Sequence, residues 1–155
     1  MISFREKSLW VSLLITQMVA VTYGDNVVDL LMAGADVASE EIVGILIRAV
    51  FIFVVLEVVL NILLAMNEQE GAGLPEDERE KTFRLKANDA GYWVLSVGVV
   101  GCIVQHLINN SVDFEAQSAI ARFILSPIEL KLVVIFWASE VTRFAVEVFH
   151  FRMNA

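Results

Sequence analysis

Ionisable side chains inside long apolar segments are the residues of this sequence that could do chemistry. Glu57 and Glu140 each lie near the middle of such a segment, where a charge in a lipid bilayer costs at least about 2.5–3.5 kcal/mol. Burial favours the neutral form of a carboxyl group, so either glutamate could bind a proton or a small cation. The candidate polar residues of these segments are Arg48, Glu57, Asn61, Lys131, Glu140, Arg143 and Glu147.

The spacing of the candidates indicates which of them share a helix face. Glu140, Arg143 and Glu147 are three and four residues apart, as neighbours on one helix surface are. Glu57 and Asn61, which are four apart, share a face in the same way. If the two helices meet, Arg143 could bridge Glu57 and Glu140. Three interpretations stay open: a polar path for ions, a buried network that only fixes helix packing, or an interface with another subunit.

The remaining motifs give no sign of catalysis. The sequence has no HExxH, CxxCH, Walker or nucleophile-elbow pattern, so we expect no enzyme activity, no metal and no cofactor. His106 and His150 stand near opposite ends of their segments, which argues against a shared haem. His106 belongs to a polar outer end of the third segment, as an interfacial residue or a pH-sensitive gate. The members of that end are Gln105, His106 and Asn109.

Four long apolar segments would position these residues. Of the 155 residues, 57% are hydrophobic and 19% are charged, against roughly 45–50% and 25% in a soluble domain. A helix of about 17–25 residues crosses a bilayer, and 8–23, 42–66, 91–108 and 128–149 have or approach that length. The sequence therefore predicts one all-α domain over 1–155, a four-transmembrane-helix bundle. Its net charge of −8 argues against a nucleic-acid partner.

The first and third apolar segments each leave one alternative open. Basic residues precede 8–23, as in a signal peptide, but no small-x-small cleavage site follows, so we interpret the segment as a retained helix. The third segment carries Gly98, Gly101 and Cys102, and small residues let helices approach closely. They could pack within the bundle or against another copy of the chain.

Lysine and arginine gather on one side of the predicted membrane. The connections at 24–41 and 109–127 hold only Arg122 between them, and basic residues favour the cytoplasmic side. We therefore expect both termini and the loop at 67–90 in the cytoplasm. The basic residues of that side are Arg5, Lys7, Arg79, Lys81, Arg84, Lys86 and Arg152.

The two halves of the chain align when one is displaced by 83 residues. Each half contains two apolar segments, so both copies enter the membrane from the same side. This predicts two parallel two-helix units related by a pseudo-twofold axis along the membrane normal. The alignment pairs Trp10 with Trp93, Arg48 with Lys131, and Glu57 with Glu140.

The connections carry helical signals of their own. Pro75 and the acids after it suit the first turn of a helix, which could run on into the third segment. On the outer side, 27–37 and 118–126 are apolar but too short to span a bilayer, which predicts short interfacial helices. A re-entrant segment lining a cavity is the alternative.

The segment PEDEREKTFRLKANDAGYWVL at 75–95 resembles a stretch of small uncharacterised bacterial inner-membrane proteins. In those proteins an acidic and basic D-E-R-type loop leads into a span that bears aromatic residues. The resemblance implies a bacterial inner-membrane location and carries no site residue to this chain.

These observations favour a small oligomeric channel or transporter-like protein for protons or small cations, with Glu57 and Glu140 as the ion-binding groups. The alternative is a non-conducting membrane subunit, regulator or scaffold, whose intramembrane charges lock the helices together. In that case the loop at 67–90 would bind a cytoplasmic protein. Both readings place the chain in a lipid bilayer, and the first favours a homo-oligomer.

Overall fold

The structure of the chain is a computed structural model in which residues 4–33, 39–67, 77–109 and 119–153 are described. All regular structure in these residues is helical, which confirms the predicted all-α class. Each of the four predicted apolar segments lies within one of the long helices. The helices are α1 (Phe4–Ala33), α2 (Ser39–Asn67), α4 (Glu78–Asn109), α5 (Ala119–Leu125) and α6 (Ile128–Met153).

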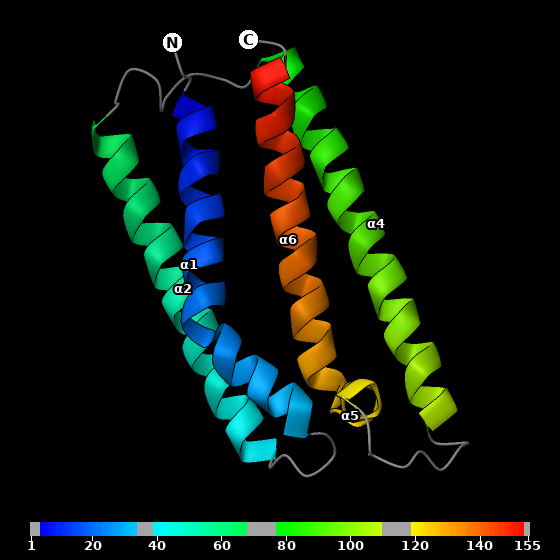
Figure 1. The fold of residues 1–155 in the computed structure, drawn as a ribbon. Helices are drawn as coiled ribbons and strands as arrows, with labels where there is room; N and C mark the ends of the chain where they lie inside the picture. The colour runs from blue at the N-terminus through cyan, green and yellow to red at the C-terminus, as the bar shows by residue number, and fades with distance from the viewer. Residues whose placement is uncertain (1–3, 34–38, 68–76, 110–118, 154–155) are drawn as a thin grey trace.

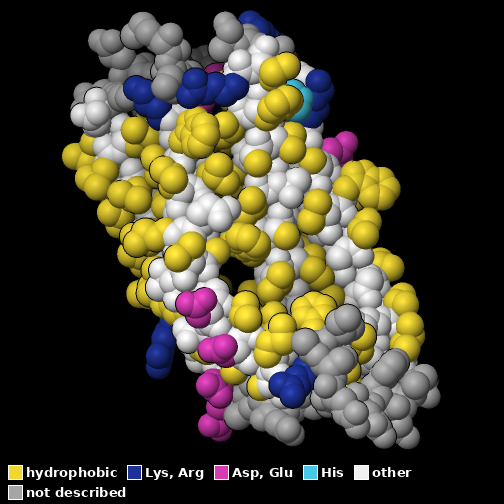
Figure 2. Space-filling view, viewed as in Figure 1, with side chains coloured by type: hydrophobic (Ala, Val, Ile, Leu, Met, Phe, Trp, Pro, Cys, Tyr) yellow, Lys and Arg dark blue, Asp and Glu magenta, His cyan; other side chains and the backbone are white. Residues whose placement is uncertain are grey.

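Three of these helices, α1, α2 and α4, are long and apolar enough to cross a membrane. Many of their apolar side chains are exposed on the surface of the chain, as the yellow areas of Figure 2 show. This length and this surface indicate a membrane protein. α6 has 26 residues, about 39 Å at 1.5 Å per residue, but its 128–149 segment carries five ionisable side chains (Asp, Glu, Lys or Arg).

α1 is longer than the sequence predicted. It has 30 residues and continues past 8–23 into the outer connection, so the separate interfacial helix expected at 27–37 is wrong for its first part. Residues 34–37 lie outside the described residues. α1 bends in its second half, and its C-terminal end approaches α5 (Figure 1). This end is held by a buried apolar cluster that joins α1, α2 and α6, formed by Leu30, Leu31, Ile42 and Leu130.

α4 confirms that the helix of the middle connection runs on into the third apolar segment, since it is continuous over 32 residues. Asp77 precedes it, and the Asp77 carboxylate accepts a hydrogen bond from the Glu78 N–H at 2.7 Å. The Glu80 carboxylate accepts one from the Asp77 N–H at 3.2 Å, the backward contact of a capping box. Pro75 lies outside the described residues. α5 confirms the short helix predicted within 118–126.

The four long helices stand in a row in the order α2, α1, α6, α4 (Figure 1). α4 and α6 pack most extensively, α1 packs against both α6 and α2, and α5 lies against α1 and α4. Over the described ranges α2 makes no comparable contact with α4 or α6, so the row differs from a closed bundle. α6 carries most of the Asp, Glu, Lys and Arg side chains that lie within the four predicted apolar segments, and it has a helix on each side, whereas the strongly apolar α2 lies at an edge.

Both chain ends and the start of α4 lie at one end of this row (Figure 1). Arg5 Nε lies 3.0 Å from Glu80 Oε2, which joins α1 to α4. Arg152 Nε lies 2.8 Å from Glu6 Oε1, which joins α6 to α1. Most of the lysine and arginine side chains visible in Figure 2 gather at this end. The three basic segments of the sequence therefore share one end of the molecule.

The small residues of α4 face α6. Ala87, Gly91 and Cys102 are buried, and a Cβ on Gly91 would lie 3.1 Å from Cβ of Arg143. Gly98 lies directly against a branched side chain of α6, whereas nothing lies within 4 Å of a Cβ on Gly101. Gly91 and Gly98 thus pack against α6 within the chain, whereas Gly101 points away from α6.

Candidate functional site

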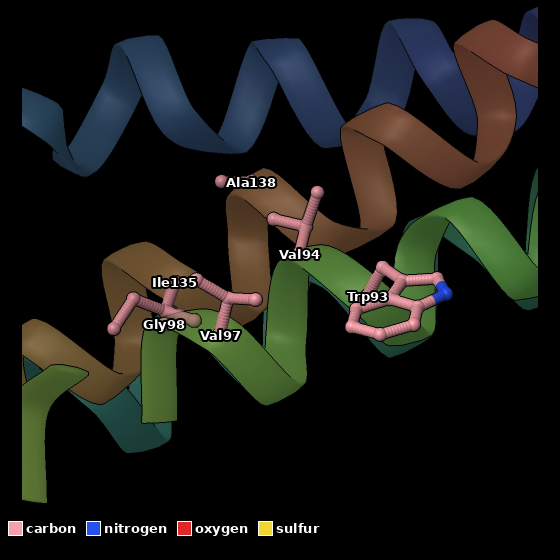
Figure 3. Close-up of a pocket in the computed structure, with 6 residues that line it drawn as sticks. All are labelled: Trp93, Val94, Val97, Gly98, Ile135 and Ala138. Carbon is pink, nitrogen blue, oxygen red and sulfur yellow. The ribbon is translucent and has the colours of Figure 1, made fainter. Parts of the chain in front are cut away.

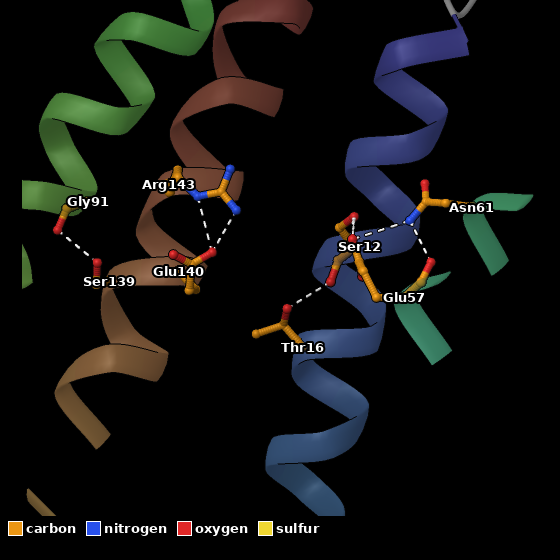
Figure 4. Close-up of polar contacts among 8 residues, drawn as sticks. All are labelled: Ser12, Thr16, Glu57, Asn61, Gly91, Ser139, Glu140 and Arg143. Carbon is orange, nitrogen blue, oxygen red and sulfur yellow. Dashed lines mark hydrogen bonds and ion pairs between the residues drawn. The ribbon is translucent and has the colours of Figure 1, made fainter. Parts of the chain in front are cut away.

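A polar cluster joins α1 and α2 around Glu57, and Figure 4 draws it. Ser12 Oγ donates a hydrogen bond to Glu57 Oε1, and Ser8 Oγ donates one to Asn61 Oδ1. Asn61 Nδ2 lies 3.2 Å from Glu57 Oε1 and 2.9 Å from the main-chain oxygen of Glu57. Ser12 and Asn61 therefore hold the carboxylate from two helices, and Ser8 holds Asn61.

The local sequence places these groups on facing sides of the two helices. Ser8 and Ser12 are four residues apart on α1, as Glu57 and Asn61 are on α2, so each pair occupies one helix face. Sequence reasoning found the α2 pair and missed the two serines. Their signal was the spacing of Ser8, Ser12 and Thr16, three hydroxyl side chains four residues apart at the start of an apolar helix.

The second carboxylate oxygen of Glu57 is the chemically distinctive atom of the cluster. Glu57 Oε2 is buried and has no hydrogen-bond partner among the described residues. A buried charged oxygen without a partner is costly, more so in hydrocarbon than in a soluble protein. A proton or a cation on this oxygen would remove that cost.

Glu140 has a different environment, because it is paired within its own helix. Arg143 Nη2 lies 2.6 Å and Arg143 Nε 3.1 Å from Glu140 Oε2. The Arg143 guanidinium also lies over the ring of Phe144, 4.1 Å from its centroid. Both side chains of this ion pair are largely buried: 29% of the Arg143 side chain and 26% of the Glu140 side chain are exposed.

The structure does not bring Glu57 and Glu140 together, and the expected bridge through Arg143 is wrong. α1 stands between α2 and α6, so Glu57 faces the serines of α1, as the two separate sets of dashed lines in Figure 4 show. Arg143 instead pairs with Glu140, the acid three residues before it. A neutral contact completes the α4–α6 packing nearby, where Ser139 Oγ donates to the main-chain oxygen of Gly91 at 2.8 Å.

Lys131 belongs to a polar group at the end of the row opposite the chain termini, which the sequence predicted to be the outer end, away from Glu57 (Figure 1). Its Nζ donates to the main-chain oxygen of Ile124 at 2.7 Å, and Asn109 Nδ2 donates to the same oxygen at 2.6 Å. Lys131 Nζ also lies 5.8 Å from the centroid of Phe123. One carbonyl of α5 thus ties together the end of α4 and the start of α6.

The other candidates are not among the residues that form the α1–α2 cluster, the Glu140–Arg143 pair or the group around Lys131. Arg48 is exposed on α2, and Glu147 is buried on α6. Gln105 is half-buried near the outer end of α4, and His106 beside it is exposed. His150 lies at the opposite end of the molecule, with its ring centroid 5.7 Å from that of Phe83. The structure therefore divides the predicted site into an α1–α2 cluster, an α6 ion pair and an outer group.

A shallow apolar groove on α4 and α6 offers no route for ions. Figure 3 shows its walls, with the Trp93 indole at one end. It contains no charged side chain, and its lining residues are Trp93, Val94, Val97, Gly98, Ile135 and Ala138.

No group of three His, Cys, Asp or Glu side chains that could hold a metal ion occurs in the part of the chain that the structure describes. Glu57 Oε2, beside its hydroxyl and amide neighbours, is the buried carboxylate oxygen without a hydrogen-bond partner in the described α1–α2 cluster. Comparison of the chain with protein-family models, with curated proteins and with solved structures finds no match.

Proposed function

We propose that this chain is a multi-pass membrane protein that takes up a proton or a small cation at Glu57 and carries it across the bilayer. The observation that supports this function is the buried Oε2 of Glu57, which has no hydrogen-bond partner among the described residues while Oε1 accepts hydrogen bonds from Ser12 and Asn61. A carboxylate that is held in place by one oxygen and has no partner on the other suits reversible ion binding, because its side chain need move little between the bound and the empty state.

Glu57, and not Glu140, is the ion-binding group in this proposal. Glu140 already has Arg143 as its counter-charge, so a second cation there would be repelled by the guanidinium. This ion pair lies within α6 and leaves neither charge unpaired where α6 packs against its neighbours. We therefore assign Glu140 and Arg143 a structural role.

Four membrane crossings follow if α6 accompanies its neighbours. α6 packs along α4 and α1, both of which are apolar enough to span, and its Glu140 charge is paired. The two helix pairs also pack in nearly the same register, which favours the repeat. Ser8 of α1 contacts Asn61 of α2, and a displacement of 83 residues turns this pair into Gly91 and Phe144. Gly91 of α4 lies against Arg143 of α6, one residue from that position. The parallel repeat of two-helix units is therefore part of the proposal.

The shared basic end gives the proposed orientation. Lysine and arginine are retained on the cytoplasmic side of bacterial inner membranes, and the ion pairs of Arg5 and Arg152 place both termini and the start of α4 together. We assign this end to the cytoplasm and the acidic start of α2 to the outer side.

The test is ion flux through liposomes that contain the purified protein and an internal pH-sensitive dye. A potassium diffusion potential drives proton entry, and in a parallel series a sodium gradient drives sodium entry that a trapped sodium-sensitive dye reports. We expect Glu57→Gln to lose most of the flux, because the amide cannot release or accept the transported charge. Glu140→Gln is the matched control and retains flux where the protein remains assembled.

Two results would contradict this function. The first is flux in Glu57→Gln equal to that of the wild type, with unchanged helicity and assembly. The second is a wild-type protein that conducts no better than protein-free liposomes under either gradient.

A non-conducting subunit or regulator is the second candidate, and one observation favours it. α4 begins at Glu78, about 20 Å before Gly91 at 1.5 Å per residue, so a charged helical extension stands beyond the apolar segment. Thr82, Leu85 and Lys86 are exposed on it and could bind a cytoplasmic protein. Substituting these three residues would then abolish co-purification of that protein from native membranes, and the wild-type chain would show no Glu57-dependent flux in liposomes.

A further inference from the structure

The order of the helices shows how the two repeated units meet. The first unit is α1 with α2, and the second is α4 with α6, so α1 corresponds to α4 and α2 to α6. In the row α2, α1, α6, α4 each unit has its second helix on the same side. The first helix of one unit therefore packs against the second helix of the other, which is a head-to-tail contact.

This order differs from the predicted pseudo-twofold arrangement. A twofold axis would match the α1–α6 contact with an equal α4–α2 contact, and the described residues show no such packing. A head-to-tail contact between two units leaves one contact surface uncovered at each end of the row. These two surfaces are the outward faces of α4 and α2.

Two buried positions of the α1–α6 contact have exposed counterparts on those faces. Glu6 is 5% exposed where it meets α6, and its counterpart on α4, Asp89, is exposed. Leu130 is 0% exposed against α1, and its counterpart on α2, Ile47, is 64% exposed. At these two repeat positions the outward faces of α4 and α2 thus carry the same kinds of residue as the α1–α6 contact, but no helix of the chain packs over them.

We propose that copies of this chain assemble head to tail, with α2 of one copy packed against α4 of the next as α6 packs against α1 within the chain. The occupant of each edge is thus a second copy, because the chain itself already contains one contact of this type. The inference rests on the repeat of the two-helix unit and does not depend on ion binding at Glu57.

The register of the proposed contact follows from the inner one. Transferring the level of the Glu6–Arg152 pair by 83 residues in both helices places Val100 of one copy level with residue 58 of the next, one residue from Val59. Both residues point outward: Val59 is two residues from Glu57, which faces α1, and Val100 is two residues from Gly98, which faces α6. Two residues turn a helix by about 200°. Val59 is 46% and Val100 59% exposed.

Cysteine cross-linking in native membranes tests this contact. In a background with Cys102→Ser, a chain with both Val59→Cys and Val100→Cys is oxidised and separated without reductant. We expect a ladder of two, three and more linked chains, since each copy offers one cysteine to each neighbour. Either cysteine alone should give no linked pair. The control pair Met66→Cys with Val100→Cys uses a residue seven positions further along α2, about 10 Å away, and should give little product.

Three outcomes would overturn the proposal. Strong dimers from either single-cysteine variant would show that like edges meet, which is a two-fold contact. Equal yields from the test and control pairs would show random collision. An absence of product in all variants, with folded protein in the membrane, would show that lipid covers both edges. None of these results depends on flux, so they leave the ion-binding role of Glu57 to its own experiment.

Discussion

Gly98 of α4 lies directly against Ile135 of α6, so closely that a Cβ built on the glycine would clash with Cγ2 of the isoleucine. Cγ2 is fixed to the branched Cβ of Ile135 and cannot swing away as the end of a long side chain can. The close approach of α4 and α6 therefore depends on the absence of a side chain at residue 98, as in other small-residue helix contacts in membranes.

Replacing Gly98 by Val should weaken the α4–α6 packing. Overpacking of this kind costs about 1–3 kcal/mol, and denaturation in mixed detergent micelles, followed by circular dichroism, would measure the loss. Gly101→Val is the matched control on the same helix, because a Cβ there meets nothing within 4 Å. Equal stability of the two variants would show that α4 does not approach α6 at Gly98.

Removal of Arg143 should destabilise the protein more than removal of the whole ion pair. Arg143→Met leaves the Glu140 carboxylate without its counter-charge between the helices, and breaking a buried pair from one side costs up to about 3–5 kcal/mol. Because both groups are partly exposed, we expect a loss below the upper end of that range. Adding Glu140→Gln to Arg143→Met should restore much of the stability in the same assay. A double variant as unstable as Arg143→Met alone would contradict this pairing.

The helices could be predicted from the sequence because each rests on a local pattern. Apolar runs of the length of a bilayer marked all four long helices, and the charged start of α4 carried its own helix signal. The extent of α1 could not be read in this way, because residues 24–33 mix acids with apolar side chains. Leu30 and Leu31 pack in a cluster with Ile42 of α2 and Leu130 of α6, which lie far from them in the sequence.

The site was harder to predict because it depends on which helices are neighbours. Spacing placed Glu57 and Asn61 on one face, but the residues that meet this face are Ser8 and Ser12 of α1. A serine in an apolar helix can bond to its own backbone, so it does not reveal a partner. α1 separates Glu57 from Arg143 because of the order in which the helices pack. The spacing of residues within one sequence does not determine that order.

The carbonyl of Ile124 should hold α5 in place through the two donors that share it. Asn109→Ala removes one of them, and side-chain hydrogen bonds between membrane helices contribute about 0.6–1.7 kcal/mol. Amide hydrogen exchange in α5 should then rise about 3- to 18-fold, as mass spectrometry of its peptides would show. Gln105→Ala, near the same end of α4, is the control. Unchanged exchange in Asn109→Ala would remove this role for Asn109.

Cysteine labelling should place the shared end of the molecule on the cytoplasmic side. Thr82 and Met153 are exposed near that end, and Glu41 is exposed at the start of α2 near the other end. In a Cys102→Ser background, a membrane-impermeant maleimide should label Thr82→Cys and Met153→Cys only in inverted vesicles. It should label Glu41→Cys only in intact spheroplasts. Because the ion pairs of Arg5 and Arg152 fix both termini and the start of α4 together, opposite labelling of Thr82→Cys and Met153→Cys would contradict the fold itself. A joint reversal of all three would contradict only the orientation.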